Sequence, residues 1–140
     1  MESARAQLLE LAARYAAGVD RRDRDLLLST MHPRARFSIP ATGIALTGHD
    51  ELPRVFELLA RFDRTFHLVG NACYEVAGDT ATGEVYCQAH HLRGGQDFTT
   101  INRYQDVYAR GAGGWRITER TVVIDWTYTV PAGGLGPAGG

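Results

Sequence analysis

The stretch that decides the fold runs from Thr65 to Leu92 and reads TFHLVGNACYEVAGDTATGEVYCQAHHL. Two β-rich segments flank the tripeptide GDT at positions 78–80, and a tight turn of this kind between such segments predicts a β-hairpin. In the second segment, residues 81–92, small apolar side chains alternate with large and mostly polar ones. The hairpin therefore predicts a sheet that packs one face on a core and turns the other face outward.

Two further strand-like segments follow toward the C-terminus. The runs FTTINRYQDVYAR (98–110) and WRITERTVVIDWTYTV (115–130) come after the glycine-containing turns RGGQD and GAGG. Long strands that follow one another through short turns pair as hairpins. We therefore expect a mixed, mostly antiparallel sheet in the second half of the chain.

The first half of the chain has the periodicity of helices. Apolar residues spaced by three and four give one buried face to a helix over about residues 3–21. Asp23 is suited to cap a short second helix, which Pro33 is expected to end. A third helix, with Asp50 as its cap, is predicted over residues 49–62.

Two short strands, RARFSIP (34–40) and GIALTG (43–48), lie between the second and third helices. Helices in the first half and hairpins in the second indicate an α+β fold in one domain over residues 1–130. A curved sheet wrapped around helices leaves a pocket where its far end is unfilled. The glycine- and proline-rich tail 131–140 is expected to be disordered.

The composition excludes several classes of protein. The net charge of −1 and the absence of a basic, aromatic-rich run argue against nucleic acid as a partner. No segment approaches the ~20 apolar residues of a membrane span, and the N-terminus does not resemble a signal peptide. The two cysteines, Cys73 and Cys87, do not make a disulfide framework. We therefore expect a soluble, cytoplasmic domain.

The adjacent histidines His90 and His91 point to opposite faces if they lie in a regular strand. Alternation places His91 on the small, apolar face that packs inward and His90 on the outer face. A β-bulge would reverse this assignment. By itself an inward histidine is as often a hydrogen-bonded core residue as a functional one.

Three other side chains are candidates for the pocket. His67 stands in an apolar run, where a histidine needs a partner or a function, and shares a strand face with Asn71. Tyr15 lies on the buried stripe of the first helix, and its hydroxyl requires a partner. Asp20 is about 140° further round that helix, so the residues alone favour a solvated helix end.

Charged side chains also lie among the apolar residues of the last strands, at positions Arg103, Asp106, Arg120 and Asp125. An inward Arg–Asp pair would hold a substrate oxygen or brace the sheet. No metal-binding, glycine-rich nucleotide-binding or G-x-S-x-G motif is present in the sequence. Cys87 and His91 are separated by four strand residues, about 13 Å, which is too far for a nucleophile and its base.

Three stretches together resemble the SnoaL-like group of the nuclear transport factor 2-like superfamily. They are YAAGVDRRDRDLLLSTMHPRARF, TFHLVGNACYEVAGDTATGEVYCQAHH and NRYQDVYARGAGGWRITERTVVIDW, and the likeness spans about residues 4–128. The subgroup it most resembles contains scytalone dehydratase and bile-acid 7α-dehydratase. The resemblance implies a cone-shaped barrel of three helices and a curved sheet that encloses a pocket, assembled as a homodimer or homotrimer.

The resemblance also implies the site. A helix tyrosine, an aspartate five residues on and a strand histidine fall on Tyr15, Asp20 and His67. The histidine or aspartate of the next strand falls on His91 or its neighbour His90, and we choose His91 because it agrees with the alternation. We recognise no counterpart of the serine and asparagine that some dehydratases carry on later strands. We assign substrate contacts to His90, Arg120, Asn71, Phe37 and Phe56.

The reaction that this set implies is dehydration or cyclisation of a small hydrophobic carbonyl compound without a cofactor or metal. In this hypothesis His67 removes a proton next to the carbonyl and His91 returns it to the departing hydroxyl. Tyr15 polarises the carbonyl, and Asp20 orients a histidine. The alternatives are a non-catalytic ligand-binding or oligomerisation domain, or an isomerase or epoxide hydrolase of the same fold.

Overall fold

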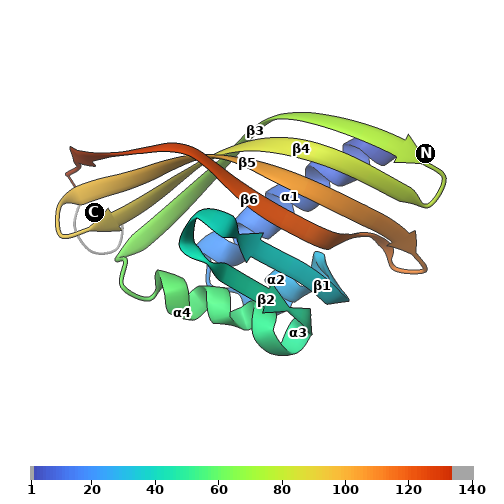
Figure 1. The fold of residues 1–140 in the computed structure, drawn as a ribbon, viewed down its shortest axis with the longest axis horizontal. Helices are drawn as coiled ribbons and strands as arrows, with labels where there is room; N and C mark the ends of the chain where they lie inside the picture. The colour runs from blue at the N-terminus through green and yellow to red at the C-terminus, as the bar shows by residue number, and fades with distance from the viewer. Residues whose placement is uncertain (1, 134–140) are drawn as a thin grey trace.

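The computed structural model describes residues 2–133. It shows a long, curved sheet with helices packed against one side (Figure 1). The helices are α1 (Ala4–Asp20), α2 (Arg24–Ser29), α3 (Gly48–Glu51) and α4 (Val55–Leu59), with 3-10 turns at Pro40–Thr42 and Leu52–Arg54. The strands are β1 (Met31–Ile39), β2 (Ile44–Thr47), β3 (Arg64–Ala77), β4 (Thr80–Arg93), β5 (Gln96–Gly111) and β6 (Gly114–Pro131).

The six strands form one sheet in the order β2-β1-β6-β5-β4-β3. The predicted hairpins β3–β4, β4–β5 and β5–β6 are all present and antiparallel. β1 pairs with β6 in the parallel direction, which joins the first half of the chain to its last strand. The α+β class and the mostly antiparallel sheet are confirmed, and the sheet stays open between its edge strands β2 and β3.

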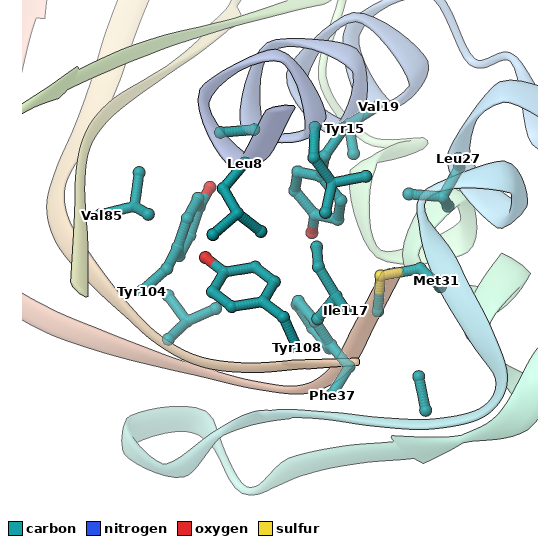
Figure 2. Close-up of a cluster of buried hydrophobic side chains, with 14 of the residues drawn as sticks. Leu8, Tyr15, Val19, Leu27, Met31, Phe37, Val85, Tyr104, Tyr108 and Ile117 are labelled. Carbon is teal, nitrogen blue, oxygen red and sulfur yellow. The ribbon is translucent and has the colours of Figure 1, made fainter. Parts of the chain in front are cut away.

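α1 lies across the sheet and buries the face that its periodicity predicts (Figure 1). Leu8 and Val19 of that face are almost completely buried. Figure 2 shows the rings of Tyr15, Tyr104 and Tyr108 gathered with Leu8 beneath the helix. The core is therefore filled by the helix from one side and by aromatic side chains of β5 from the other.

The predicted third helix is divided into α3, a 3-10 turn and α4. Pro53 lies in that 3-10 turn, where it cannot donate the backbone hydrogen bond that a continuous α-helix requires. Thr47, rather than Asp50, precedes the first turn, and its N–H donates to the Glu51 carboxylate at 2.8 Å. The prediction of one helix from residue 49 to 62 was therefore wrong in its continuity and its cap.

Two other boundaries differ from expectation. α2 ends at Ser29, and Pro33 lies inside β1, where the pairing with β6 is irregular between Met31 and Arg36. β6 continues to Pro131, so the first residue of the expected disordered tail belongs to a strand. The remainder of that expectation, residues 134–140, lies outside the described part of the chain.

The outer face of the sheet carries large apolar side chains in register. Phe66 pairs with His90, and further across the sheet Thr99 pairs with Tyr128. The neighbouring row runs through Leu68, Gln88, Ile101 and Trp126. Phe66 and Trp126 are 61% and 60% exposed. Within residues 2–133 no helix is long and apolar enough to cross a membrane.

Candidate active site

The end of α1 meets the start of the edge strand β3 through Asp20 and His67. The Nδ1–H of His67 donates to Oδ1 of Asp20 at 2.7 Å, and the backbone N–H of His67 donates to Oδ2 at 2.8 Å. Only 20% of the Asp20 side chain and 10% of the His67 side chain remain exposed. Asp20 is therefore not a solvated helix end, because β3 closes over it.

These contacts fix the ionisation of Asp20 and the tautomer of His67. Burial by itself raises the pKa of Asp20, but hydrogen bonds from the His67 ring, the His67 amide and Thr65 outweigh it and leave the pKa below its usual range. Because the ionised carboxylate only accepts hydrogen bonds, Nδ1 of His67 carries the proton. In the neutral ring the lone pair is then on Nε2, on the other side of the ring.

His91 lies on β4, opposite Thr65 of β3, and its ring lines the same cavity as the ring of His67. The two ring centroids are 6.1 Å apart. Nδ1–H of His91 donates to the Phe98 carbonyl oxygen at 2.9 Å. Burial lowers the pKa of His91, so that its resting state is neutral with an unprotonated Nε2.

The cavity has a volume of about 180 Å³. Its wall is mostly apolar and is built by α1, β1, β2, α4 and strands β3 to β6. The uncharged polar and imidazole side chains in the wall are Tyr15, Thr42, His67, His91, Thr100, Asn102 and Tyr104. A few polar groups converging on an apolar hollow are typical of a small-molecule site.

Tyr15 forms part of the wall above a buried ion pair. Arg120 lies under the Tyr15 ring and over the Tyr104 ring, with its guanidinium carbon 4.2 and 4.0 Å from the two centroids. Asp106 accepts two hydrogen bonds from Arg120, at 2.8 and 2.7 Å, and one from Tyr108 at 2.6 Å. Burial raises the pKa of Tyr15 to about 12, against the charge of Arg120. Tyr15 is therefore a neutral hydrogen-bond donor at pH 7.

Four residues that we expected to contact substrate lie outside the cavity wall, whereas Phe37 lines it. Arg120 is sealed beneath Tyr15 by its pair with Asp106. His90 points to the outer face, where Nδ1 lies 2.8 Å from Asp97. Phe56 packs on the core. Val55, the first residue of α4 after the break at Pro53, lines the cavity instead.

Asn71 is exposed, and the reason is a bulge in β3. Val69 pairs with Cys87 and Ala72 with Val85, so Gly70 and Asn71 together face a single residue of β4. One extra residue reverses the facing of the strand beyond it. Asn71 therefore does not share the inner face with His67, as simple alternation predicts.

Thr100 and Asn102 line the cavity, but the sequence analysis did not identify them as site residues. The amide Nδ2 of Asn102 donates to Oγ1 of Thr100 at 2.8 Å, and its Oδ1 has no hydrogen-bond partner within the described residues. The signal was present, because both residues alternate with Phe98 and Tyr104 along β5. Pairing of Phe98 with His91 through the RGGQD turn puts this set on the inner face.

The Asp–Arg–Asp set of an epoxide hydrolase is not assembled. Asp106 and Arg120 form the buried pair, while Asp125 accepts two hydrogen bonds from Arg103 on the other face of the sheet, at 2.8 and 2.9 Å. Among residues 2–133, no three histidine, cysteine or carboxylate side chains converge in the manner of metal ligands.

The fold and the site define a small α+β domain whose pocket wall includes a histidine held by an aspartate behind it. The family model described as the SnoaL-like domain matches residues 2–121. The chain therefore belongs to the SnoaL-like family, within the nuclear transport factor 2-like superfamily. No curated protein sequence matches the chain significantly.

Solved structures show the same fold at low sequence identity. The Kfla4162 protein of Kribbella flavida is 20% identical, with a TM-score of 0.81 over 89% of this chain and 92% of that one. The hexachlorocyclohexane dehydrochlorinase LinA-type3 of Novosphingobium barchaimii is 20% identical, with a TM-score of 0.80 over 90% and 89%. A scytalone dehydratase candidate from Novosphingobium aromaticivorans is 20% identical, with a TM-score of 0.76 over 94% and 92%.

Proposed function

We propose that the protein is a cofactor-independent lyase that eliminates water from a small hydrophobic carbonyl compound, with the Asp20–His67 dyad as its base. The observation that carries the proposal is the 2.7 Å hydrogen bond from Nδ1–H of His67 to Asp20. In the neutral imidazole this bond places the lone pair on Nε2, on a ring that lines an apolar cavity. A histidine oriented by a buried carboxylate is suited to removing a proton from carbon.

The remaining wall groups suit the other parts of an elimination. Tyr15, a neutral phenol above the Arg120 charge, donates to the carbonyl oxygen as negative charge grows on it. The amide oxygen Oδ1 of Asn102 has no partner within the described residues, which suits it to accept a hydrogen bond from a second polar group of the substrate. The Tyr15 hydroxyl is thus the donor that stabilises the enolate formed when His67 takes the proton.

The proposed roles of the two histidines differ from our expectation. A neutral His91 with its proton on Nδ1, held by the Phe98 carbonyl, is not a resident acid. We therefore assign proton delivery to His67: its imidazolium returns the proton to the departing hydroxyl while the C–O bond breaks and the C=C bond forms. Nε2 of His91 accepts a hydrogen bond from the hydroxyl and holds it in place. Water leaves, and the dyad is regenerated.

The size of the cavity favours a substrate with one ring. An apolar cavity of about 150 Å³ holds one benzene molecule, and the cavity here has a volume of about 180 Å³. A steroid nucleus has four fused rings and exceeds this space. Among the substrate classes that the sequence suggested, a single-ring aromatic or polyketide-like carbonyl compound therefore fits best.

The names of the structural neighbours support an elimination. One is a dehydrochlorinase and another a dehydratase candidate, and both reactions remove a carbon-bound proton together with a leaving group. A non-catalytic binding domain is the competing function. The paired Asp20 carboxylate argues against it, because a mere binding surface does not need an ionised group that orients a histidine of the cavity wall.

The test is turnover of single-ring β-hydroxy ketones, followed by the absorbance of the conjugated product. We expect His67→Ala to lower turnover at least ~100-fold, the usual scale for loss of a general base. His90→Ala, which changes the neighbouring histidine on the outer face, is the matched control and should retain turnover. Equal turnover by the His67→Ala variant would remove the dyad from the mechanism.

A further inference from the structure

The turn after α1 has an arginine at a position that usually requires glycine. The N–H of Asp23 donates to the Gly18 carbonyl at 2.9 Å, and the N–H of Arg22 donates to the Val19 carbonyl at 3.1 Å. This pair of bonds is the Schellman motif, whose next-to-last residue adopts the left-handed conformation. Arg22 has φ 54° and is the one non-glycine residue with positive φ among residues 2–133.

An L-residue in this conformation costs free energy that glycine avoids. The Arg22 side chain makes contacts that glycine cannot make. Its Nη1 donates to the Val19 carbonyl at 2.7 Å and to Oγ1 of Thr65 at 2.8 Å. Oγ1 of Thr65 in turn donates to Oδ1 of Asp20 at 3.0 Å.

The direction of this chain of hydrogen bonds is fixed by chemistry. A guanidinium group only donates and an ionised carboxylate only accepts, so the Thr65 hydroxyl must accept from Arg22 and donate to Asp20. Thr65 is buried and pairs across the hairpin with His91. Its hydroxyl therefore has a single consistent orientation, which is toward Oδ1, the oxygen that holds the His67 ring.

We propose that Arg22 and Thr65 are positioning residues that hold the Asp20 carboxylate ionised and in the orientation that His67 requires. The relay Arg22–Thr65–Asp20 ties the left-handed turn to the dyad. The proposal rests on the proposed function for its catalytic meaning, but the relay itself can be measured without a substrate. The side chain of the left-handed Arg22 reaches Thr65, which no glycine could do.

Other charged and ionisable groups surround Asp20 and must be considered in any titration. β4 presents Cys87 and His91, and the turn before β3 presents Arg61 near His91. The groups that share an open groove with Asp20 are Arg22, Asp63, Arg64, His90 and Asp97. Arg22 is the cation that reaches Asp20 through a hydrogen-bonded hydroxyl.

The experiment follows the titration of the Asp20 carboxyl carbon by NMR in the full chain. In Arg22→Gly and Thr65→Val we expect the pKa of Asp20 to rise by about 0.5 unit or more, since each change removes a donor or charge that favours the ionised form. Thr65→Ser keeps the hydroxyl and should restore the original titration. Arg22→Gly should also keep or raise the melting temperature, because glycine prefers the left-handed conformation.

Arg21→Ala is the matched control, because it removes an arginine one residue away whose backbone, but no side-chain group, bonds to α1. An unchanged Asp20 titration in both Arg22→Gly and Thr65→Val overturns the relay. An equal shift in Arg21→Ala also overturns it, because the effect would then be one of net charge. If His67→Ala retains turnover while the Asp20 titration shifts as expected, the elimination proposal fails and the relay stands.

Discussion

At the level of single residues, the burial of His91 couples its protonation to folding. Its side chain is surrounded by Phe62, Phe98 and His67, and burial lowers its pKa below the value of about 6.5 expected in an unfolded chain. As the pH falls below that value, the unfolded state binds a proton more readily than the folded state. The contribution of His91 to stability is therefore present above pH 6.5 and is lost as the pH falls toward the folded pKa.

We accordingly expect the free energy of unfolding by urea to fall between pH 7.5 and pH 5. The variant His91→Asn keeps a donor for the Phe98 carbonyl but does not titrate, so its stability should change less over this range. His32→Asn, which alters a partly exposed histidine, should keep the dependence of the original protein. A steep pH dependence that survives in His91→Asn would contradict this account.

Single residues also show where sequence reasoning succeeds and where it stops. Alternation along one strand was enough to distinguish His91 from His90, because β4 is regular from Thr80 to Arg93. The same argument failed for Asn71, because the bulge in β3 leaves no mark in the pattern of apolar residues. The resemblance placed Asp20 at the site without naming the histidine that it orients. The contact of Asp20 with His67 is seen only in the structure, since nothing local in the sequence brings the two together.

At the level of elements, the rings of Tyr74 on β3 and Tyr108 on β5 lie close over Gly83 of β4. A methyl group at this position would lie 2.6 Å from the Tyr74 ring and 3.0 Å from the Tyr108 ring. Both rings pack edge-to-face at 5.9 Å and fill the space that the missing side chain leaves. The glycine thus lets two strands carry large aromatic side chains on the same inner face.

We expect Gly83→Ala to lower the free energy of unfolding by about 1–3 kcal/mol, the usual cost of overpacking. Gly70→Ala is the matched control in β3, because its added methyl group would meet its nearest neighbour at an ordinary 3.8 Å. Urea unfolding of the two variants measures the difference. Equal stability of Gly83→Ala and the original protein would contradict the prediction, because the Tyr74 ring would then move aside at no cost in free energy.

The helices and hairpins were largely predictable because their signals are local. Periodicity located α1 to within one residue at each end. Asp23 caps α2 as predicted, because its carboxylate accepts a hydrogen bond from the Leu26 N–H at 3.0 Å. The division of the third helix was not predicted, because the effect of Pro53 depends on how the flanking turns pack. Local patterns therefore fix the type of an element more reliably than its continuity.

At the level of the whole molecule, the outer face of the sheet is a surface suited to another copy of the chain. Phe66, Leu68, Trp126 and Tyr128 lie exposed on two adjacent rows of four strands. Several large apolar side chains exposed on one face commonly mark an interaction site, and the net charge of −1 opposes self-association little. The homodimer or homotrimer that the resemblance implies would cover it.

We expect Trp126→Lys to shift the protein toward the monomer in sedimentation experiments, because it places a charge in the middle of the patch. Leu9→Lys, at an exposed position of α1 away from this face, is the matched control and should leave the assembly unchanged. A protein that sediments as a monomer at all concentrations would contradict the expectation.

The arrangement of the sheet was the part of the fold least accessible to residue patterns. Consecutive hairpins gave the order of β3 to β6, but nothing in the sequence indicates that β1 joins β6 in parallel. That pairing depends on the whole core being present, since no turn connects the two strands. The pocket was expected from the curvature of the sheet. The residues of its wall could not be predicted, because they depend on the bulge in β3 and on the break in the third helix after Pro53.

The parallel pairing of β1 with β6 has a consequence for how the chain folds during synthesis. Arg36 and Glu119, which meet across this pair at 2.8 Å, are 83 residues apart in sequence. When α1 and β1 leave the ribosome, the strands that will cover them have not yet been translated. The parallel pair cannot form until β6 has been made, and such long-range closure slows folding. The sheet, and the cavity that it lines, can therefore close only after nearly all of the domain has been synthesised.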